Sequence, residues 1–119
     1  MKLTDAEWAV MEALWSAERM TLSEAVNALR PVKGWNKNTV FTYLTRMEHK
    51  GLVAIDRTHD RPYAAAVSRE VCAREERDDL LSRVYGGATG DLIAAFLKES
   101  AISKEEVERL KQMLDEMEV

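Results

Sequence analysis

The sequence predicts a mostly α-helical protein that contains one small β-hairpin. Apolar residues recur at three- and four-residue spacing through most of the 119-residue chain, which is typical of amphipathic helices. The helix-capping pattern Thr/Ser-x-x-Glu occurs at residues 4–7, 21–24 and 103–106. After Gly51 the period changes, and short apolar runs at 52–55 and 63–67 flank a polar stretch, as in a hairpin. The length allows one domain or two very small ones.

The first 50 residues predict three helices. The first begins at the capping pattern of residues 4–7 and extends to about residue 16. The second begins at residues 21–24, and we expect Pro31 to end it, because proline disfavours helical geometry in the residue before it. Asn36 is the expected N-cap of the third helix, which Gly51 stops.

The third helix has two unlike faces. Val40, Leu44 and Met47, with Tyr43 beside them, share the side that would face a core. Threonine is a poor helix former, so several threonines on the opposite face indicate a contact surface rather than an ordinary solvated one. Short polar side chains let a helix approach DNA closely, and an arginine can reach phosphate or guanine. The groove-facing candidates are Asn38, Thr39, Thr42, Thr45 and Arg46, with Phe41 at the edge of this face.

Three helices followed by a β-hairpin make a winged helix-turn-helix, which we assign to residues 1–67. The hairpin would be the wing, with Arg57, His59 and Arg61 at its tip near the sugar-phosphate backbone. Lys33, Lys37 and Lys50 are further candidates for phosphate contacts.

Residues 68–119 predict a helical region. Helices are expected from Ser68 to about Tyr85, from Thr89 or Asp91 to about Glu99, and after Ser103. Their apolar residues are too few to close a core alone, which favours pairing with a second copy; internal packing within a monomer is the alternative. The candidate dimerisation residues are Leu81, Val84, Leu92, Ile93, Phe96, Leu97, Val107, Leu110, Leu114 and Met117.

Composition narrows the function classes. The formal net charge is −4, but residues 30–61 carry seven Lys or Arg against three Asp or Glu, so the local field favours a phosphate partner. A single cysteine, Cys72, excludes an intramolecular disulfide. We expect no membrane span, no signal peptide and a cytoplasmic location. No motif indicates catalysis, a metal site or a cofactor, so an enzyme is not expected.

The chain resembles the BlaI/MecI type of bacterial transcriptional repressor, the penicillinase repressor family. The resemblance begins at residues 3–15, LTDAEWAVMEALW, and continues through 35–40, 44–47 and 50–52. It extends to 92–97 and 103–110, and so covers nearly the whole chain.

This resemblance implies a homodimeric winged-helix repressor that binds a palindromic operator in double-stranded DNA. It places Asn38, Thr39, Thr42 and Arg46 at the family's recognition-helix positions. It also implies control of the chain's own gene and of neighbouring resistance or sensor-protease genes. Induction in the family comes from proteolytic cutting, commonly at an Asn-Phe bond, and the aligned pair here is Ala95-Phe96. The paired cysteines of the family's copper-responsive branch are absent.

Several alternatives stay open at this point. Phe41 could touch a thymine methyl or pack against the second helix. Trp8, Trp15 and Trp35 could stack on bases, although their spacing favours the core. Cys72 could be a redox sensor, although a half-buried structural thiol is the simpler interpretation. The whole chain could also be a protein-interaction module on a winged-helix scaffold, because fold does not settle function.

Overall fold

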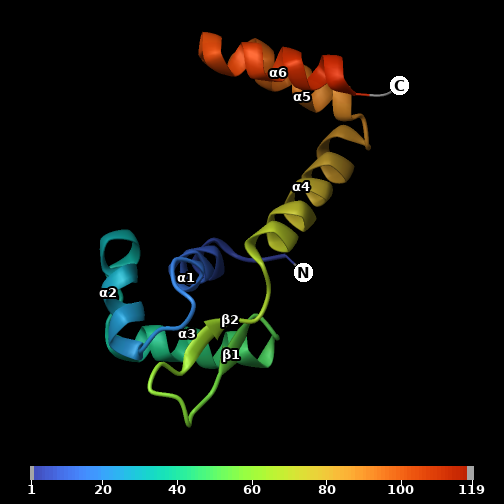
Figure 1. The fold of residues 1–119 in the computed structure, drawn as a ribbon. Helices are drawn as coiled ribbons and strands as arrows, with labels where there is room; N and C mark the ends of the chain where they lie inside the picture. Colours follow the sequence, from blue (N-terminus) through green and yellow to red (C-terminus); the bar gives the residue numbers. More distant parts are fainter. Residues whose placement is uncertain (1, 118–119) are drawn as a thin grey trace. The chain divides into compact units, whose positions relative to one another are not determined.

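The computed structural model describes residues 2–117 of the chain. Three helices come first, followed by a two-stranded hairpin and three further helices (Figure 1). In chain order the elements are α1 (Asp5–Trp15), α2 (Leu22–Lys33), α3 (Lys37–His49), β1 (Val53–Ile55), β2 (Tyr63–Ala65), α4 (Arg69–Tyr85), α5 (Thr89–Glu99) and α6 (Lys104–Glu116). The predicted fold class, a winged helix-turn-helix followed by a helical region, is confirmed.

The chain divides into two compact units between Arg77 and Asp78. The first unit therefore includes the start of α4 as well as the winged helix. Cys72 on α4 explains this, because its side chain is buried in the core of the first unit. The predicted boundary lies earlier, between residues 67 and 68, after the hairpin.

The predicted caps of the first two helices are confirmed. Thr4 and Glu7 form a reciprocal capping box at the start of α1, and Thr21 and Glu24 form another at the start of α2. At α6 only half of the predicted box is present among the described contacts, in which the Ser103 hydroxyl accepts the Glu106 backbone N–H at 3.2 Å.

The prediction that Pro31 ends α2 is wrong. The helix continues through Pro31 to Lys33. It ends instead at Gly34, whose positive φ of 65° lets its backbone N–H reach the carbonyls of Leu29 and Arg30. Proline removes one backbone hydrogen-bond donor, but only two more helical residues follow Pro31 before Gly34 ends the helix.

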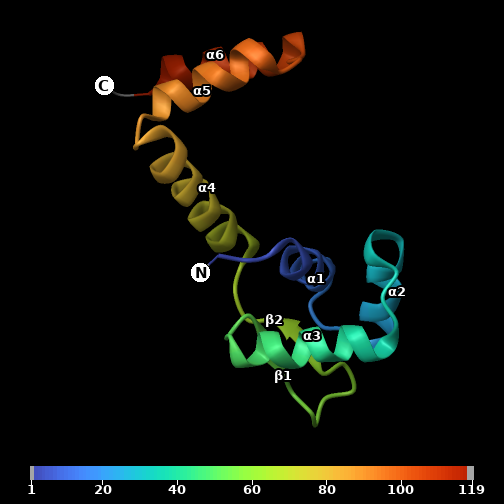
Figure 2. The same ribbon diagram turned by 180° about the vertical axis from the view of Figure 1, so that it is seen from behind.

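The hairpin packs beside α3 and α1. Its strands are antiparallel, with Ala54 opposite Ala64 at the centre of the register. Met20, in the connection between α1 and α2, exchanges two backbone hydrogen bonds with Tyr63, at 2.8 and 3.0 Å. This extra bridge, which was not predicted, ties the wing to the connection between the first two helices. In Figures 1 and 2 the loop joining the strands extends beyond α3.

The core of the first unit lies where α1, α2, α3 and the hairpin meet. Val40, Leu44 and Met47 of α3 are fully buried, as the helical spacing predicted. Trp8, Trp15 and Trp35 are partly buried and pack against this core. The Trp15 indole N–H donates to the Val67 carbonyl at 2.9 Å, which holds the chain that leaves the hairpin. The core interpretation of the tryptophans is therefore confirmed.

The second unit lacks a comparable core. Neither α5 nor α6 contains a buried residue. Among the described residues of this unit, the large apolar side chains that are exposed are Val84, Ile93, Phe96, Leu97, Met113, Leu114 and Met117. Gly86 and Gly87, both with positive φ, separate α4 from α5 as predicted.

Candidate nucleic-acid interface

The start of α3 is fixed by its own sequence. Asn36 has an extended backbone, and its side-chain oxygen accepts the Thr39 backbone N–H at 2.9 Å. Just before it, the rings of Trp35 and Tyr43 stack with centroids 4.5 Å apart, and the Lys33 ammonium lies 6.0 Å from the Trp35 centroid. The start of α3 is thus held by a capping hydrogen bond and by ring stacking between Trp35 and Tyr43.

The outer face of α3 presents the residues that the sequence selected. Asn38, Thr42 and Arg46 are exposed, whereas Thr39 and Thr45 are half-buried. Four of these five, together with Tyr43, line a shallow hollow on the surface: Asn38, Thr39, Thr42 and Arg46. Phe41 is 49% exposed, so it does not pack fully against the second helix.

The threonine hydroxyls bond to the helix itself. Thr42 donates to the Asn38 carbonyl and Thr45 donates to the Phe41 carbonyl, each at 2.9 Å. These bonds satisfy the hydroxyl protons and leave oxygen lone pairs and methyl groups for an approaching partner. A surface of this kind can accept hydrogen bonds from base amino groups and touch a thymine methyl.

Cations are present on α3 without neutralising partners. Within residues 2–117, no carboxylate forms an ion pair with Lys37 or Arg46. Lys37 lies in the first turn and Arg46 in the last, so they border the polar face at both ends. A guanidinium free of protein carboxylates can contact a phosphate or a guanine edge without first losing another partner.

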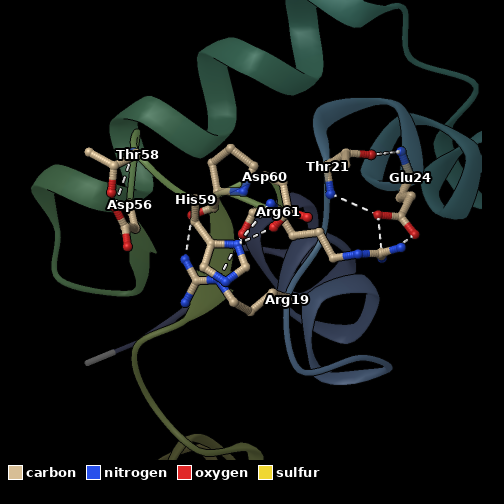
Figure 3. A network of polar contacts seen from close by, with 9 residues as sticks. Arg19, Thr21, Glu24, Asp56, Thr58, His59, Asp60 and Arg61 are labelled. Carbon is tan, nitrogen blue, oxygen red and sulfur yellow. Dashed lines mark hydrogen bonds and ion pairs between the residues drawn. The ribbon is translucent and has the colours of Figure 1, made fainter.

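The wing arginines have protein partners. The Arg57 guanidinium contacts the Glu48 carboxylate of α3 through two nitrogens, each at 3.1 Å. Arg61 Nη1 contacts both Glu24 oxygens at 2.7 and 2.6 Å. Figure 3 shows the second of these pairs. Contact of Arg57 and Arg61 with DNA stays a prediction, and it requires these carboxylates to be displaced or shared.

The wing loop is held by further polar contacts (Figure 3). Arg19 donates to the backbone carbonyls of Arg61 and Pro62, at 2.7 and 2.9 Å. His59 Nδ1 accepts the Arg61 backbone N–H at 2.9 Å, so this ring nitrogen is turned toward the loop. The role of Arg19 was not predicted, because a single arginine in a connection carries no pattern.

Lys50 also has a structural partner. Its ammonium lies 2.6 Å from Oε2 of Glu7, a carboxylate only 5% exposed. Burial pushes the pKa of Glu7 upward, but the Lys50 hydrogen bond and the Thr4 backbone N–H outweigh burial, and the pKa is lowered. The pair ties the end of α3 to the start of α1. The expected contact of Lys50 with phosphate stays a prediction, in competition with this role.

Cys72 does not have the surroundings of a reactive thiol. It is buried, and burial, followed by the nearby Glu75 charge, raises its pKa. Within residues 2–117 there is no cluster of His, Cys, Asp or Glu that could hold a metal ion. In the same part of the chain, no helix is long and apolar enough to cross a membrane.

The geometry defines a class of protein: a winged helix with a polar, partly cationic third helix, followed by a helical unit with exposed apolar faces. Residues 3–116 match the family model described as Penicillinase repressor. The chain belongs to this family, whose members are transcriptional regulators rather than enzymes.

Two curated relatives align with this chain over more than nine tenths of their own length. The chain is 26% identical over 117 residues to the methicillin resistance regulatory protein MecI of Staphylococcus aureus (strain N315), covering 96% of this chain and 94% of that protein. It is 25% identical to the penicillinase repressor of Bacillus licheniformis, covering 97% and 91%. A MarR/EmrR family transcriptional regulator from Acinetobacter sp. ADP1 is a solved structure with a TM-score of 0.45 and 20% identity, covering 97% of this chain and 78% of that one.

Proposed function

We propose that this protein is a transcriptional repressor that binds double-stranded DNA with α3 in the major groove. The observation that carries the proposal is the outer face of α3, where exposed short polar residues are bordered by Lys37 and Arg46. Such a face can lie close to base edges while its cations contact phosphate or guanine. The family membership supports the same function.

Within this proposal the residues have different roles. Arg46, Asn38 and Thr42 read base edges, because their side chains are exposed on one face. Phe41 contacts a thymine methyl at the edge of this face, as its partial exposure allows. The remaining contacts are to the backbone or near it, from Thr39, Thr45, Lys33, Lys37 and the wing residues.

The repressor acts as a homodimer on a palindromic operator. The exposed apolar residues of α5 and α6 support this, because apolar residues gathered on an exposed surface are typical of protein–protein contact sites. A two-fold dimer would place two α3 helices about one turn of DNA apart, so that each reads one half-site. Bound at a promoter, the dimer would block transcription of its own and neighbouring resistance or sensor-protease genes.

A regulatory protease is the proposed inducer, and Ala95-Phe96 is the proposed bond. This bond lies inside α5. A protease takes an extended backbone, so this part of α5 must unfold before the bond is cut. Mass spectrometry of the protein recovered from induced cells would identify the bond; intact protein after full induction would exclude this mode of control.

The proposed function is tested by fluorescence anisotropy of the full chain with the intergenic DNA upstream of its own gene, across a salt series. Scrambled DNA of the same length and composition is the control. We expect tighter binding of the native fragment, a steep salt dependence, and two subunits per site by sedimentation. If both DNAs bind equally weakly, the measurement is repeated with fragments obtained by a genome-wide DNA selection. Equally weak binding to those fragments would contradict the proposal and favour a protein-interaction module.

A further inference from the structure

Two cations on α3 and two arginines on the wing differ in whether the protein supplies them with an anion. Lys37 and Arg46 on α3 are unpaired with carboxylates within residues 2–117. Arg57 and Arg61 on the wing each hold a carboxylate supplied by a neighbouring helix. The two groups would meet the same DNA, yet only the wing arginines begin with an anion already bound.

The partner of Arg57 occupies the guanidinium as a phosphate would. Two Arg57 nitrogens face the two Glu48 oxygens, which is the bidentate geometry that arginine uses for phosphate as well as for carboxylate. The Arg57 hydrogen bond lowers the pKa of Glu48, so this carboxylate is ionised at neutral pH. A phosphate therefore has to replace an anion rather than water.

The partner of Arg61 is fixed independently of the arginine. Glu24 Oε1 accepts the Thr21 backbone N–H at 2.9 Å in the capping box of α2. The Thr21 backbone hydrogen bond and then the Arg61 hydrogen bond lower the pKa of Glu24. The carboxylate is thus held at the start of α2 whether or not Arg61 stays with it (Figure 3).

We propose that Glu24 and Glu48 act as built-in substitutes for DNA phosphate that weaken sequence-independent binding through the wing. This inference rests on the proposed function. Each carboxylate satisfies a wing arginine in the free protein, so a phosphate contact gains less than it would from an unpaired cation. Affinity for DNA of arbitrary sequence falls as a result. The outer face of α3, whose cations Lys37 and Arg46 have no carboxylate partner among the described residues, then contributes a larger share of the binding free energy.

The test uses the full chain and a scrambled duplex, because the effect does not depend on the operator sequence. Glu24→Gln and Glu48→Gln, singly and together, release the wing arginines. Glutamine at residue 24 can keep the capping box, so α2 retains its start. The matched control is Glu12→Gln with Glu70→Gln, which removes the same charge from exposed pairs with Arg69 and Arg74, outside the wing.

We expect the Glu24→Gln/Glu48→Gln protein to bind scrambled DNA roughly five- to tenfold more tightly per released arginine at 0.1 M salt. The slope of log affinity against log salt should steepen by about one per arginine. A gain no larger than that of the control pair would overturn the proposal. Weaker binding would also overturn it, because it would mean that the ion pairs of Glu24 and Glu48 position the wing for DNA binding.

A second set of variants separates release of the arginine from a general change in charge. In an Arg57→Gln/Arg61→Gln background, the same glutamate substitutions should give no more than the control gain. Circular dichroism melting identifies variants that do not fold. If the unmodified protein fails to distinguish native from scrambled DNA, the proposed function fails; if it distinguishes them and the glutamate variants behave as the control, only this inference fails.

Discussion

The two units of the chain use apolar residues in opposite ways. In the first unit, α1, α2, α3 and the hairpin bury their apolar faces against one another, and Leu44 is fully buried. In the second unit, α5 and α6 bury no residue, and Leu114 is 63% exposed. Since burial of apolar surface is the main stabilising contribution in folding, the first unit has an apolar core to stabilise it, whereas α5 and α6 contribute none, which is consistent with the proposed pairing of this unit with a second copy.

Placing charges among the apolar residues of α6 should have the largest effect on assembly and binding. Leu110→Glu with Leu114→Glu places two charges on the surface proposed to pair with a second copy, so we expect monomers and loss of operator binding. Sedimentation velocity gives the mass and anisotropy gives the binding. The tryptophans all lie in the first unit, so unchanged tryptophan fluorescence would show that this unit stays folded.

A matched control for this variant is Lys111→Glu, which makes the same change in net charge at an exposed residue of the same helix. It should remain dimeric. A double leucine variant that still sediments as a dimer would place the dimer surface elsewhere.

A cavity in the first unit should have the next largest effect. Leu44→Ala removes buried methyl groups from the core side of α3 and should lower the free energy of unfolding by about 2–5 kcal/mol. Denaturant unfolding followed by tryptophan fluorescence measures this. Leu114→Ala is the comparison, since an exposed leucine of the second unit should leave the tryptophan transition almost unchanged.

The outer face of the same helix should respond in binding rather than in stability. Arg46→Ala should weaken binding to the native fragment by about 1–3 kcal/mol if Arg46 reads a base edge, with little change in the tryptophan transition. Anisotropy against native and scrambled DNA measures both the loss and its sequence dependence. An equal loss on the two DNAs would reduce Arg46 to a phosphate contact, and no loss would remove it from the interface.

Acid should act on the first unit through Glu7, with the smallest effect. The pKa of Glu7 is lowered from its usual 4.5 in the folded protein, so its carboxylate stabilises the fold above pH 4.5. That contribution is lost as the pH falls through the lowered folded pKa. Glu7→Gln can keep the capping box but should flatten this part of the stability-against-pH curve by about 1 kcal/mol. Parallel curves for the two proteins would mean that the Lys50–Glu7 pair contributes no net stability.

The sequence was a good guide wherever a residue acts on its own backbone or within its own element. Thr4, Thr21 and Asn36 cap the predicted helices, because a capping side chain bonds only to residues two or three positions away. The spacing of Val40, Leu44 and Met47 likewise identified the buried side of α3. Local geometry also explains the error at Pro31, because a preference can be outweighed when the helix has a stronger stop at Gly34.

Side-chain partners that lie far apart in the chain were not predicted. Glu24 was recognised as half of a capping box, but its ion pair with Arg61 joins residues 37 positions apart. Lys50 and Glu7 are 43 positions apart, and the Arg19 contacts with the wing join residues 42 and 43 positions apart. From the sequence alone the wing arginines are therefore expected to be unpaired charges, although Arg57 and Arg61 each form an ion pair with a carboxylate in the structure.

The sequence by itself determined the order of the helices, the hairpin, the two faces of α3 and the membership of a repressor family. Periodicity and capping are properties of neighbouring residues, so they can be read along the chain. Only the tertiary structure decided which cations are free and which are neutralised, where the first unit ends on α4, and that α5 and α6 leave their apolar residues uncovered. Those properties depend on which distant side chains meet when the elements pack, and no local pattern specifies them.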